Sequence, residues 1–229
     1  MKKPVNVTES LQLGIILSLS GGFMDAYSYV CRGQVFANAQ TGNILLLGTN
    51  LSEGNFSTAF QYLYPILSFT IGIVITDFLR RKASNRMNMH WMQLSILAEA
   101  LILLSVAFVS STADLLANCL VSFACGIQVE SFRMINGNGV ATTMCIGNLR
   151  TATEYLCEYT YTKDITYVKK GALFFGIILV FVIGAIIGNF AVRLWQEQAI
   201  VLSSILLFIG FIFLSISKKR ESINSVEYL

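Results

Sequence analysis

Apolar segments of about 20 residues alternate with short polar connections along most of the chain. A helix that rises 1.5 Å per residue needs about 20 apolar residues to cross the hydrocarbon core of a bilayer. Segments of this kind are predicted to form six membrane-spanning helices. They cover residues 11–31, 59–79, 92–110, 113–133, 171–192 and 199–217.

Two further segments, residues 34–51 and 140–157, are partly apolar but rich in Gly, Thr and Asn. They are too interrupted for spanning helices and too apolar for ordinary loops, so they are predicted to be re-entrant or interfacial. The alternative makes each a true crossing and gives eight spans. Basic residues accumulate on the cytoplasmic side of membrane proteins. Six spans with both termini in the cytoplasm leave only Arg32 and Arg193 outside, whereas eight spans scatter the basic residues over both sides.

The composition excludes a soluble globular protein. Hydrophobic residues make up 55% of the 229 residues and charged residues 13%, against roughly 25% charged residues in soluble domains. Residues 1–229 are therefore predicted to form one transmembrane domain with the lipid bilayer as its partner. The formal charge of +3 is too small to indicate nucleic acid as a partner. A cleavage pattern for a signal peptide is not found, so the first span is expected to stay in the protein.

No catalytic motif or metal-binding pattern stands out in the sequence. The five cysteines form no CxxC pair and are predicted to be membrane-buried apolar residues rather than disulfides or ligands. The lone His90 has no companion at metal-ligand spacing. We therefore expect no cofactor, no metal and no enzymatic activity.

The second half of the chain repeats the first. SFTIGIVITDFLRR (68–81) and VFVIGAIIGNFAVR (180–193) align without a gap and share six of fourteen residues. Ahead of them, Gly22 aligns with Gly126, and Gly42-Asn43 aligns with Gly147-Asn148 after one inserted residue. The two repeats, residues 11–110 and 113–217, contain three spans each, so the second enters the membrane from the opposite side. The alternative is a general resemblance among membrane helices.

The fold class predicted from these observations is all-α, with two inverted three-helix repeats and interrupted Gly-Asn segments. Many secondary transporters have this architecture and bind substrate near the midplane, where the repeats meet. Two similar halves of opposite orientation can exchange conformations, which gives alternating access. A fold alone does not establish transport.

Several motifs resemble the YoaK-type family of small bacterial inner-membrane proteins, long described as a domain of unknown function. They are GGFMDAYSYV, VFANAQTGNILLLG, FACGIQ and GVATTMCIGNLRTAT, and the likeness covers almost the whole chain. The resemblance implies six helices and a bacterial inner-membrane location, but no substrate. Ile146 stands where the first copy has Thr41, which puts in doubt a role that needs a hydroxyl in both repeats.

The candidate solute site is predicted near the middle of the membrane, where the first helix of each repeat contains glycine and is less stable. Glycines there permit a kink or a break, and the freed backbone groups then need partners. The predicted substrate-binding residues are Gly22, Asp25, Thr41, Gly42, Asn43, Gly126, Gln128, Glu130, Gly147 and Asn148. They are expected to surround one solvated cavity. The alternative is that the glycines permit close packing and the asparagines cap short helices.

Ionisable residues inside spans are costly and therefore mark functional candidates. Asp25, Glu99 and Glu130 are candidates for proton coupling, with a hydrogen-bonded structural carboxyl as the alternative for Glu99. Asp77 is predicted to be an interfacial salt-bridge partner. For Arg32 and Arg133, snorkelling to the interface is the simpler account, and the alternative is pairing with the acidic positions that they closely follow, Asp25 and Glu130, or attracting an anion.

Small residues at matched positions, Gly72 with Thr76 and Gly184 with Gly188, predict a packing seam between the halves or the face of a homodimer. We therefore expect a secondary transporter or facilitator of a small solute, with proton coupling as an option. The alternatives are a passive channel and a noncatalytic membrane scaffold or sensor.

Overall fold

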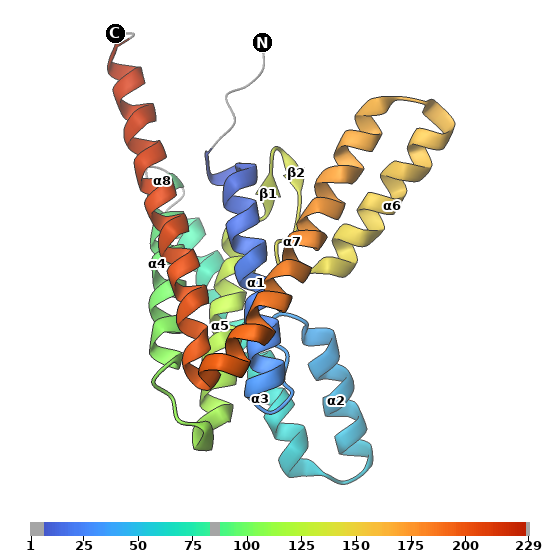
Figure 1. The fold of residues 1–229 in the computed structure, drawn as a ribbon, viewed down its shortest axis with the longest axis vertical. Helices are drawn as coiled ribbons and strands as arrows, with labels where there is room; N and C mark the ends of the chain where they lie inside the picture. The colour runs from blue at the N-terminus through green and yellow to red at the C-terminus, as the bar shows by residue number, and fades with distance from the viewer. Residues whose placement is uncertain (1–6, 83–87, 228–229) are drawn as a thin grey trace.

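The computed structural model describes residues 7–82 and 88–227, which form eight α-helices and one small hairpin. The helices are α1 (Leu11–Cys31), α2 (Gln40–Ser52), α3 (Phe56–Lys82), α4 (Asn88–Val106), α5 (Asp114–Ser131), α6 (Cys145–Thr162), α7 (Ile165–Trp195) and α8 (Val201–Glu227). The antiparallel strands β1 (Met134–Ile135) and β2 (Asn138–Gly139) lie between α5 and α6 (Figure 1). Short 3-10 helices cover Val7–Glu9, Ser111–Ala113 and Gln196–Ile200.

Each of the six predicted apolar segments is helical, and the six correspond to α1, α3, α4, α5, α7 and α8. Within the described residues, three helical stretches are long and apolar enough to cross a membrane, namely Phe56–Lys82, Ser111–Ser131 and Ile165–Ser217. The last of these contains both α7 and α8. A shorter apolar helix covers Trp91–Val106. These stretches agree with a chain that passes through a membrane several times.

The two Gly-Asn segments follow α1 and α5. Both helices run continuously through Gly22 and Gly126, so the break expected at these glycines is not what the structure contains. After α1 the chain turns at Gly33 and Gln34, which both have positive φ angles, and then runs back toward the middle of the molecule before α2 begins. After α5 the β-hairpin makes the corresponding turn before α6. Figure 1 shows that α2 and α6 begin near mid-height and run toward opposite ends of the molecule.

Helix α1 packs mainly against α7, at a contact that only glycine permits. A Cβ atom on Gly22 would collide with the backbone oxygen of Phe181, and one on Gly184 would collide with that of Leu19. The two backbones therefore touch directly. Close approach of small residues is the usual way in which helices associate in a membrane.

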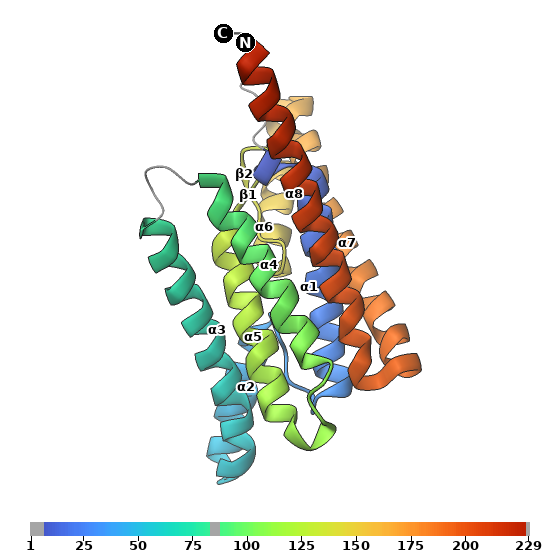
Figure 2. The same cartoon turned by 90° about the vertical axis from the view of Figure 1, so that its left-hand side faces the viewer.

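Helix α3 packs against α5 at the equivalent contact. Gly126 lies against the backbone oxygen of Phe69, and Gly72 against that of Phe123. Each of these residues aligns with a residue of the α1–α7 contact. Figure 2 shows α3 and α7 at opposite edges of the bundle, with α5 and α1 between them. The small-residue seam thus joins the two halves of one chain, and its interpretation as the face of a homodimer is wrong.

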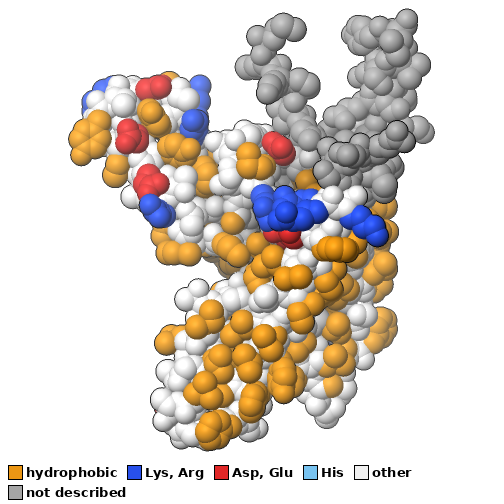
Figure 3. Space-filling view, turned by 180° about the vertical axis from the view of Figure 1, so that it is seen from behind, with side chains coloured by type: hydrophobic (Ala, Val, Ile, Leu, Met, Phe, Trp, Pro, Cys, Tyr) orange, Lys and Arg blue, Asp and Glu red, His pale blue; other side chains and the backbone are white. Residues whose placement is uncertain are grey.

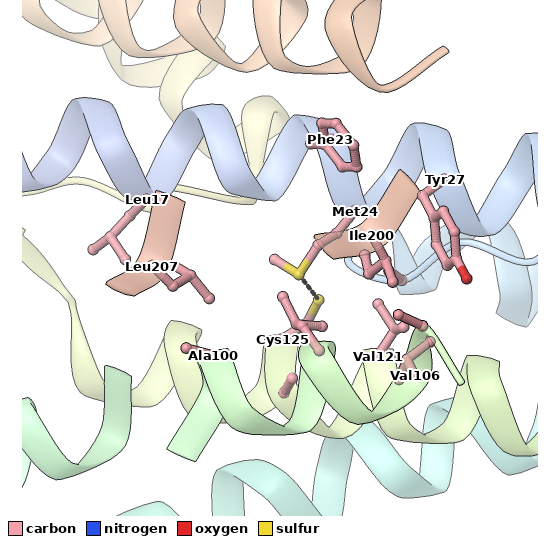
Figure 4. Close-up of a cluster of buried hydrophobic side chains, with 14 of the residues drawn as sticks. Leu17, Phe23, Met24, Tyr27, Ala100, Val106, Val121, Cys125, Ile200 and Leu207 are labelled. Carbon is pink, nitrogen blue, oxygen red and sulfur yellow. Dashed lines mark hydrogen bonds between the residues drawn. The ribbon is translucent and has the colours of Figure 1, made fainter. Parts of the chain in front are cut away.

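The apolar core lies where α1, α4, α5 and α8 meet (Figure 4). The labelled side chains come from these helices and from the turn before α8. They are Leu17, Phe23, Met24, Tyr27, Ala100, Val106, Val121, Cys125, Ile200 and Leu207. This core fixes α1 and α5, the helices that carry half of the ten predicted substrate-binding residues.

Five of the described basic residues lie toward one end of the molecule, opposite Arg32 and Arg193. The end of α3 carries Arg80, Arg81 and Lys82, and the start of α7 carries Lys169 and Lys170. Both helix ends point toward the end of the molecule where α1 begins and α8 ends (Figures 1 and 2). Other basic positions lie outside the residues or side chains described, namely Lys2, Lys3, Arg86, Lys218, Lys219 and Arg220, as does the His90 side chain.

Candidate functional site

A cavity of about 430 Å³ lies between the N-terminal ends of α2 and α6. Figure 3 shows the surface hollowed at the side of the molecule, between a lobe formed by α6 and α7 and a lobe formed by α2 and α3. Residues of both repeats line the cavity. They are Asp25, Asn38, Ala39, Gln40, Thr41, Phe69, Thr143, Met144, Cys145, Ile146 and Phe181. Asp25 and Thr41 are thus the two predicted site residues that it contains.

The Asp25 carboxyl supports the beginning of α2. Its Oδ1 atom accepts a hydrogen bond of 2.7 Å from the backbone N–H of Asn38. Ala39 stands at the N-cap position of α2 and offers no side-chain acceptor. Because the first amides of a helix lack intrahelical partners and carry partial positive charge, a carboxyl placed there is favourable. The local structure therefore accounts for an acidic residue inside α1.

Asn43 and Asn148 hold the segments that lead into the two short helices. Asn43 Oδ1 accepts a hydrogen bond of 3.0 Å from Phe36 N, and its Nδ2 donates to Phe36 O at 2.8 Å. Asn148 makes the same pair of bonds with the backbone of Ala141. Both asparagines are buried. They shape the wall of the site from behind, and neither lines the cavity.

Asn38 and Thr143 line the cavity from equivalent positions, although sequence reasoning did not select them. Asn38 Nδ2 donates to Gly21 O at 3.1 Å. The Thr143 hydroxyl is buried, and among the described residues it has no hydrogen-bond partner. The equivalent residues Phe69 and Phe181 also face the cavity. The repeat alignment was the signal available, because it places Asn38 opposite Thr143 once the inserted residue is allowed for.

The remaining predicted glycines and Gln128 lie behind or beside the cavity. Gly22 and Gly126 form the helix contacts described above, and Gly42 packs against the Phe36 ring. Gly147 lines a separate groove along α6. Gln128 is buried and donates hydrogen bonds of 3.1 Å to Leu17 O and to Thr142 Oγ1. These residues set the positions of helices and loops and have no access to a solute in this cavity.

Glu130 belongs to a different group of charges. It forms ion pairs with Arg133 and, at 3.3 Å, with Arg80. Asp77 pairs with Arg80 and Arg81, which confirms its predicted role as a salt-bridge partner. Our expectation that Glu130 shares one cavity with Asp25 is wrong, because Glu130 stands at the charged end of α5 and α3, where three arginines attract it.

Glu99 lies on α4 and is enclosed in the interior of the protein. It is fully buried, and neither carboxyl oxygen has a hydrogen-bond partner among the described residues. The alternative of a hydrogen-bonded structural carboxyl is therefore not what the structure contains. Figures 1 and 2 place α4 on the far side of α5 from the starts of α2 and α6, so Glu99 lies behind the cavity.

Arg32 does not snorkel to an interface. Its side chain is fully buried and donates hydrogen bonds of 2.9 Å to Tyr27 Oη, Asp114 Oδ1 and Val109 O. Asn118 Nδ2 donates to the Arg32 backbone oxygen at 2.7 Å. Arg32 therefore fastens the end of α1 to the turn between α4 and α5. Arg32 thus pairs with an acid, but the partner is Asp114 and not the nearby Asp25, whereas Arg133 does pair with the nearby Glu130.

Within the described residues, no three side chains of the types His, Cys, Asp or Glu come together as a metal site requires. All five cysteines are free, and Cys157 is exposed on α6. The cavity offers carboxyl, amide, hydroxyl and aromatic groups, which suit an organic solute. Together, the long apolar helices, the two interrupted segments and the cavity between them define a multi-pass helical membrane protein.

Comparison with known proteins places this membrane protein in a family. The model of the family "Protein of unknown function (DUF1275)" matches residues 13–213, so the chain belongs to that family. It is also similar to the "UPF0700 transmembrane protein YoaK" of Bacillus subtilis (strain 168), with 27% identity over 178 residues, which covers 75% of this chain and 79% of that protein. No solved structure matches the chain. The resemblance to YoaK-type proteins is confirmed.

Proposed function

We propose that the protein is a secondary transporter or facilitator of a small solute and that the cavity between α2 and α6 is its binding site. The observation that carries the proposal is the meeting of two short helices from opposite ends of the molecule at one cavity. Interrupted helices at a midplane site, drawn from two inverted repeats, are typical of secondary transporters. Asp25 and Thr41 contribute side chains from one repeat, and Thr143 contributes from the other.

The two repeats, residues 11–110 and 113–217, supply the symmetry that alternating access needs. The α1–α7 and α3–α5 contacts use equivalent residues, so exchanging the conformations of the two halves preserves the same kinds of contact. In this proposal the six long helices span a bacterial inner membrane, both termini face the cytoplasm and the cavity opens alternately to the two sides.

Asp25 is the proposed proton-coupling group because it is the acidic residue in the cavity lining. We expect Asp25→Asn to abolish uptake driven by a proton gradient while leaving exchange of the solute, because the amide keeps the shape but cannot release a proton. The measurement is uptake into proteoliposomes of solutes first selected from a panel by thermal stabilisation. Glu158→Gln is the matched control, since Glu158 is exposed on α6 outside the cavity, and it should behave as the unmodified protein.

The same vesicles separate the alternatives. Saturable uptake with counterflow supports a transporter, and flux that rises linearly with concentration without counterflow supports a passive channel. A noncatalytic scaffold or sensor would show no flux for any member of the panel. Proton-driven uptake that persists in Asp25→Asn would contradict the assigned role of Asp25.

A further inference from the structure

The two short helices both begin at the cavity without a side-chain cap. Ala39 precedes α2 and Met144 precedes α6, and neither residue carries an acceptor for the first amides. The N-terminus of a helix of this length attracts negative charge through unpaired N–H groups and the helix dipole. At α2 the Asp25 carboxyl meets this demand.

At α6 the corresponding acceptor is missing. The residue equivalent to Asp25 is Val129, which cannot accept a hydrogen bond. Among the described residues, no backbone oxygen accepts a hydrogen bond from the backbone N–H of Thr143 or Met144, and α6 has no side-chain cap. Such polar groups, when buried, are normally satisfied by a partner.

The Thr143 side chain gives an independent indication of a ligand at the same place. It is 3% exposed, it lines the cavity, and its hydroxyl has no partner in the described part of the chain. A buried hydroxyl without a partner costs about 1 to 3 kcal/mol, so a ligand acceptor at this position would be favourable. The hydroxyl and the free amides of α6 lie next to each other in the chain.

The other walls of the cavity indicate the chemistry of the rest of the ligand. Phe69, Phe181, Met144 and Ile146 present apolar surface. An inorganic anion would leave that surface without a counterpart, whereas an organic anion would cover it. We propose that the cavity binds a small organic carboxylate, whose anionic head occupies the N-terminal amides of α6 and the Thr143 hydroxyl, as the Asp25 carboxyl occupies α2.

A carboxylate in this position would lie close to Asp25. Cys145, the first residue of α6, is the other titratable side chain in the cavity lining, and Cys125 on α5 contacts Met24, the residue before Asp25. Two negative charges in one buried cavity repel each other strongly. The carboxylate and a proton on Asp25 would therefore enter the cavity together. This inference names the substrate class of the proposed function, and only its transport step rests on that function.

The first test measures equilibrium binding of benzoate and of benzamide, which has a similar shape but no charge, to the purified full chain in detergent. Benzoate should bind at least about tenfold more tightly than benzamide, corresponding to one charge-assisted hydrogen bond. Thr143→Val should weaken benzoate binding about tenfold for the same reason. Thr153→Val is the matched control, because Thr153 lies on the exposed side of α6 and should leave binding unchanged.

The second test fills the proposed head-group position. Val129→Asp should abolish benzoate binding, because the new carboxyl would cap α6 as Asp25 caps α2. Val129→Thr, which has nearly the shape of valine and no charge, should retain binding. If benzoate binding in the unmodified protein weakens as the pH rises, Asp25→Asn should remove that dependence.

Three outcomes would overturn the inference. These are equal binding of benzoate and benzamide, full benzoate binding in both Thr143→Val and Val129→Asp, and displacement of benzoate by chloride at equal concentration. Flux distinguishes this inference from the proposed function. A protein that binds benzoate but moves no solute contradicts transport alone, whereas a protein that carries neutral solutes and ignores benzoate contradicts the carboxylate site alone.

Discussion

Arg32 is an arginine held entirely inside the protein, with one acceptor for each of its three guanidinium nitrogens. Removing one partner of such a group costs more than the interaction contributes, because the remaining partners stay desolvated. Tyr27 and Val109 would both lose a buried partner. The partner carboxyl on Asp114 remains 34% exposed, which reduces the cost.

We therefore expect Arg32→Met to lower the free energy of unfolding by about 2 to 4 kcal/mol. The measurement is unfolding in mixed detergent micelles, followed by circular dichroism. Arg193→Met is the control, because Arg193 lies at the same end of the molecule but is exposed, and its replacement should change stability by less than about 0.5 kcal/mol. Equal losses for the two variants would show that the buried hydrogen bonds of Arg32 do not stabilise the fold.

Local spacing identified which residues were unusual but not always what they contact. Asp25, Asn43 and Asn148 were selected because polar groups inside apolar segments are costly, and all three make buried or partly buried hydrogen bonds. Glu130 was assigned to the wrong group because its partner Arg80 belongs to another helix, and no spacing along α5 reports that pairing. Thr143 was missed because a threonine hydroxyl usually bonds to its own helix or loop.

At the scale of elements, the direct backbone contacts between helices define the seam of the two halves. We expect Gly184→Ala to disrupt the α1–α7 contact, because even one methyl group meets the backbone of Leu19. Overpacking of this kind costs about 1 to 3 kcal/mol or more. Size-exclusion profiles and thermal unfolding in detergent should show loss of the monodisperse folded protein.

Gly176→Ala is the matched control on the same helix, since nothing lies within 4 Å of a Cβ atom built there. This variant should be neutral or slightly stabilising, because alanine favours helix by up to about 1 kcal/mol over glycine. If both glycines tolerate alanine equally, the two backbones are not in direct contact.

The six long helices could be predicted from hydropathy because each contains a long apolar run, although within the described residues only three helical stretches have spanning length and hydropathy. The interrupted segments could be predicted from their Gly, Thr and Asn content. The direction in which each segment turns back depends on backbone angles at Gln34 and Asn136, and both residues have positive φ although neither is glycine. The β-hairpin after α5 was not predicted, because each of its strands has only two residues.

At the scale of the whole molecule, the proposed inverted arrangement predicts which loops face each side of the membrane. Single cysteines placed at Asn55 and at Gln196, on a background without native cysteines, should react with an impermeant reagent added from outside the cell. A cysteine at Lys163 should react only after the inner face is exposed, because basic residues concentrate on that side. Labelling of Asn55 from the cytoplasmic side alone would contradict the inverted repeat.

The pairing of α1 with α7 also limits how early during synthesis the protein can complete its fold. Leu19 can contact Gly184 only after Gly184 has been synthesised. At synthesis rates of about 5 to 20 residues per second, the roughly 165 intervening residues take about 8 to 33 seconds. During that interval the glycine face of α1 has no permanent neighbour. Until α7 is inserted, this face of α1 contacts lipid or another protein, and about four-fifths of the chain must be synthesised before the α1–α7 contact can form.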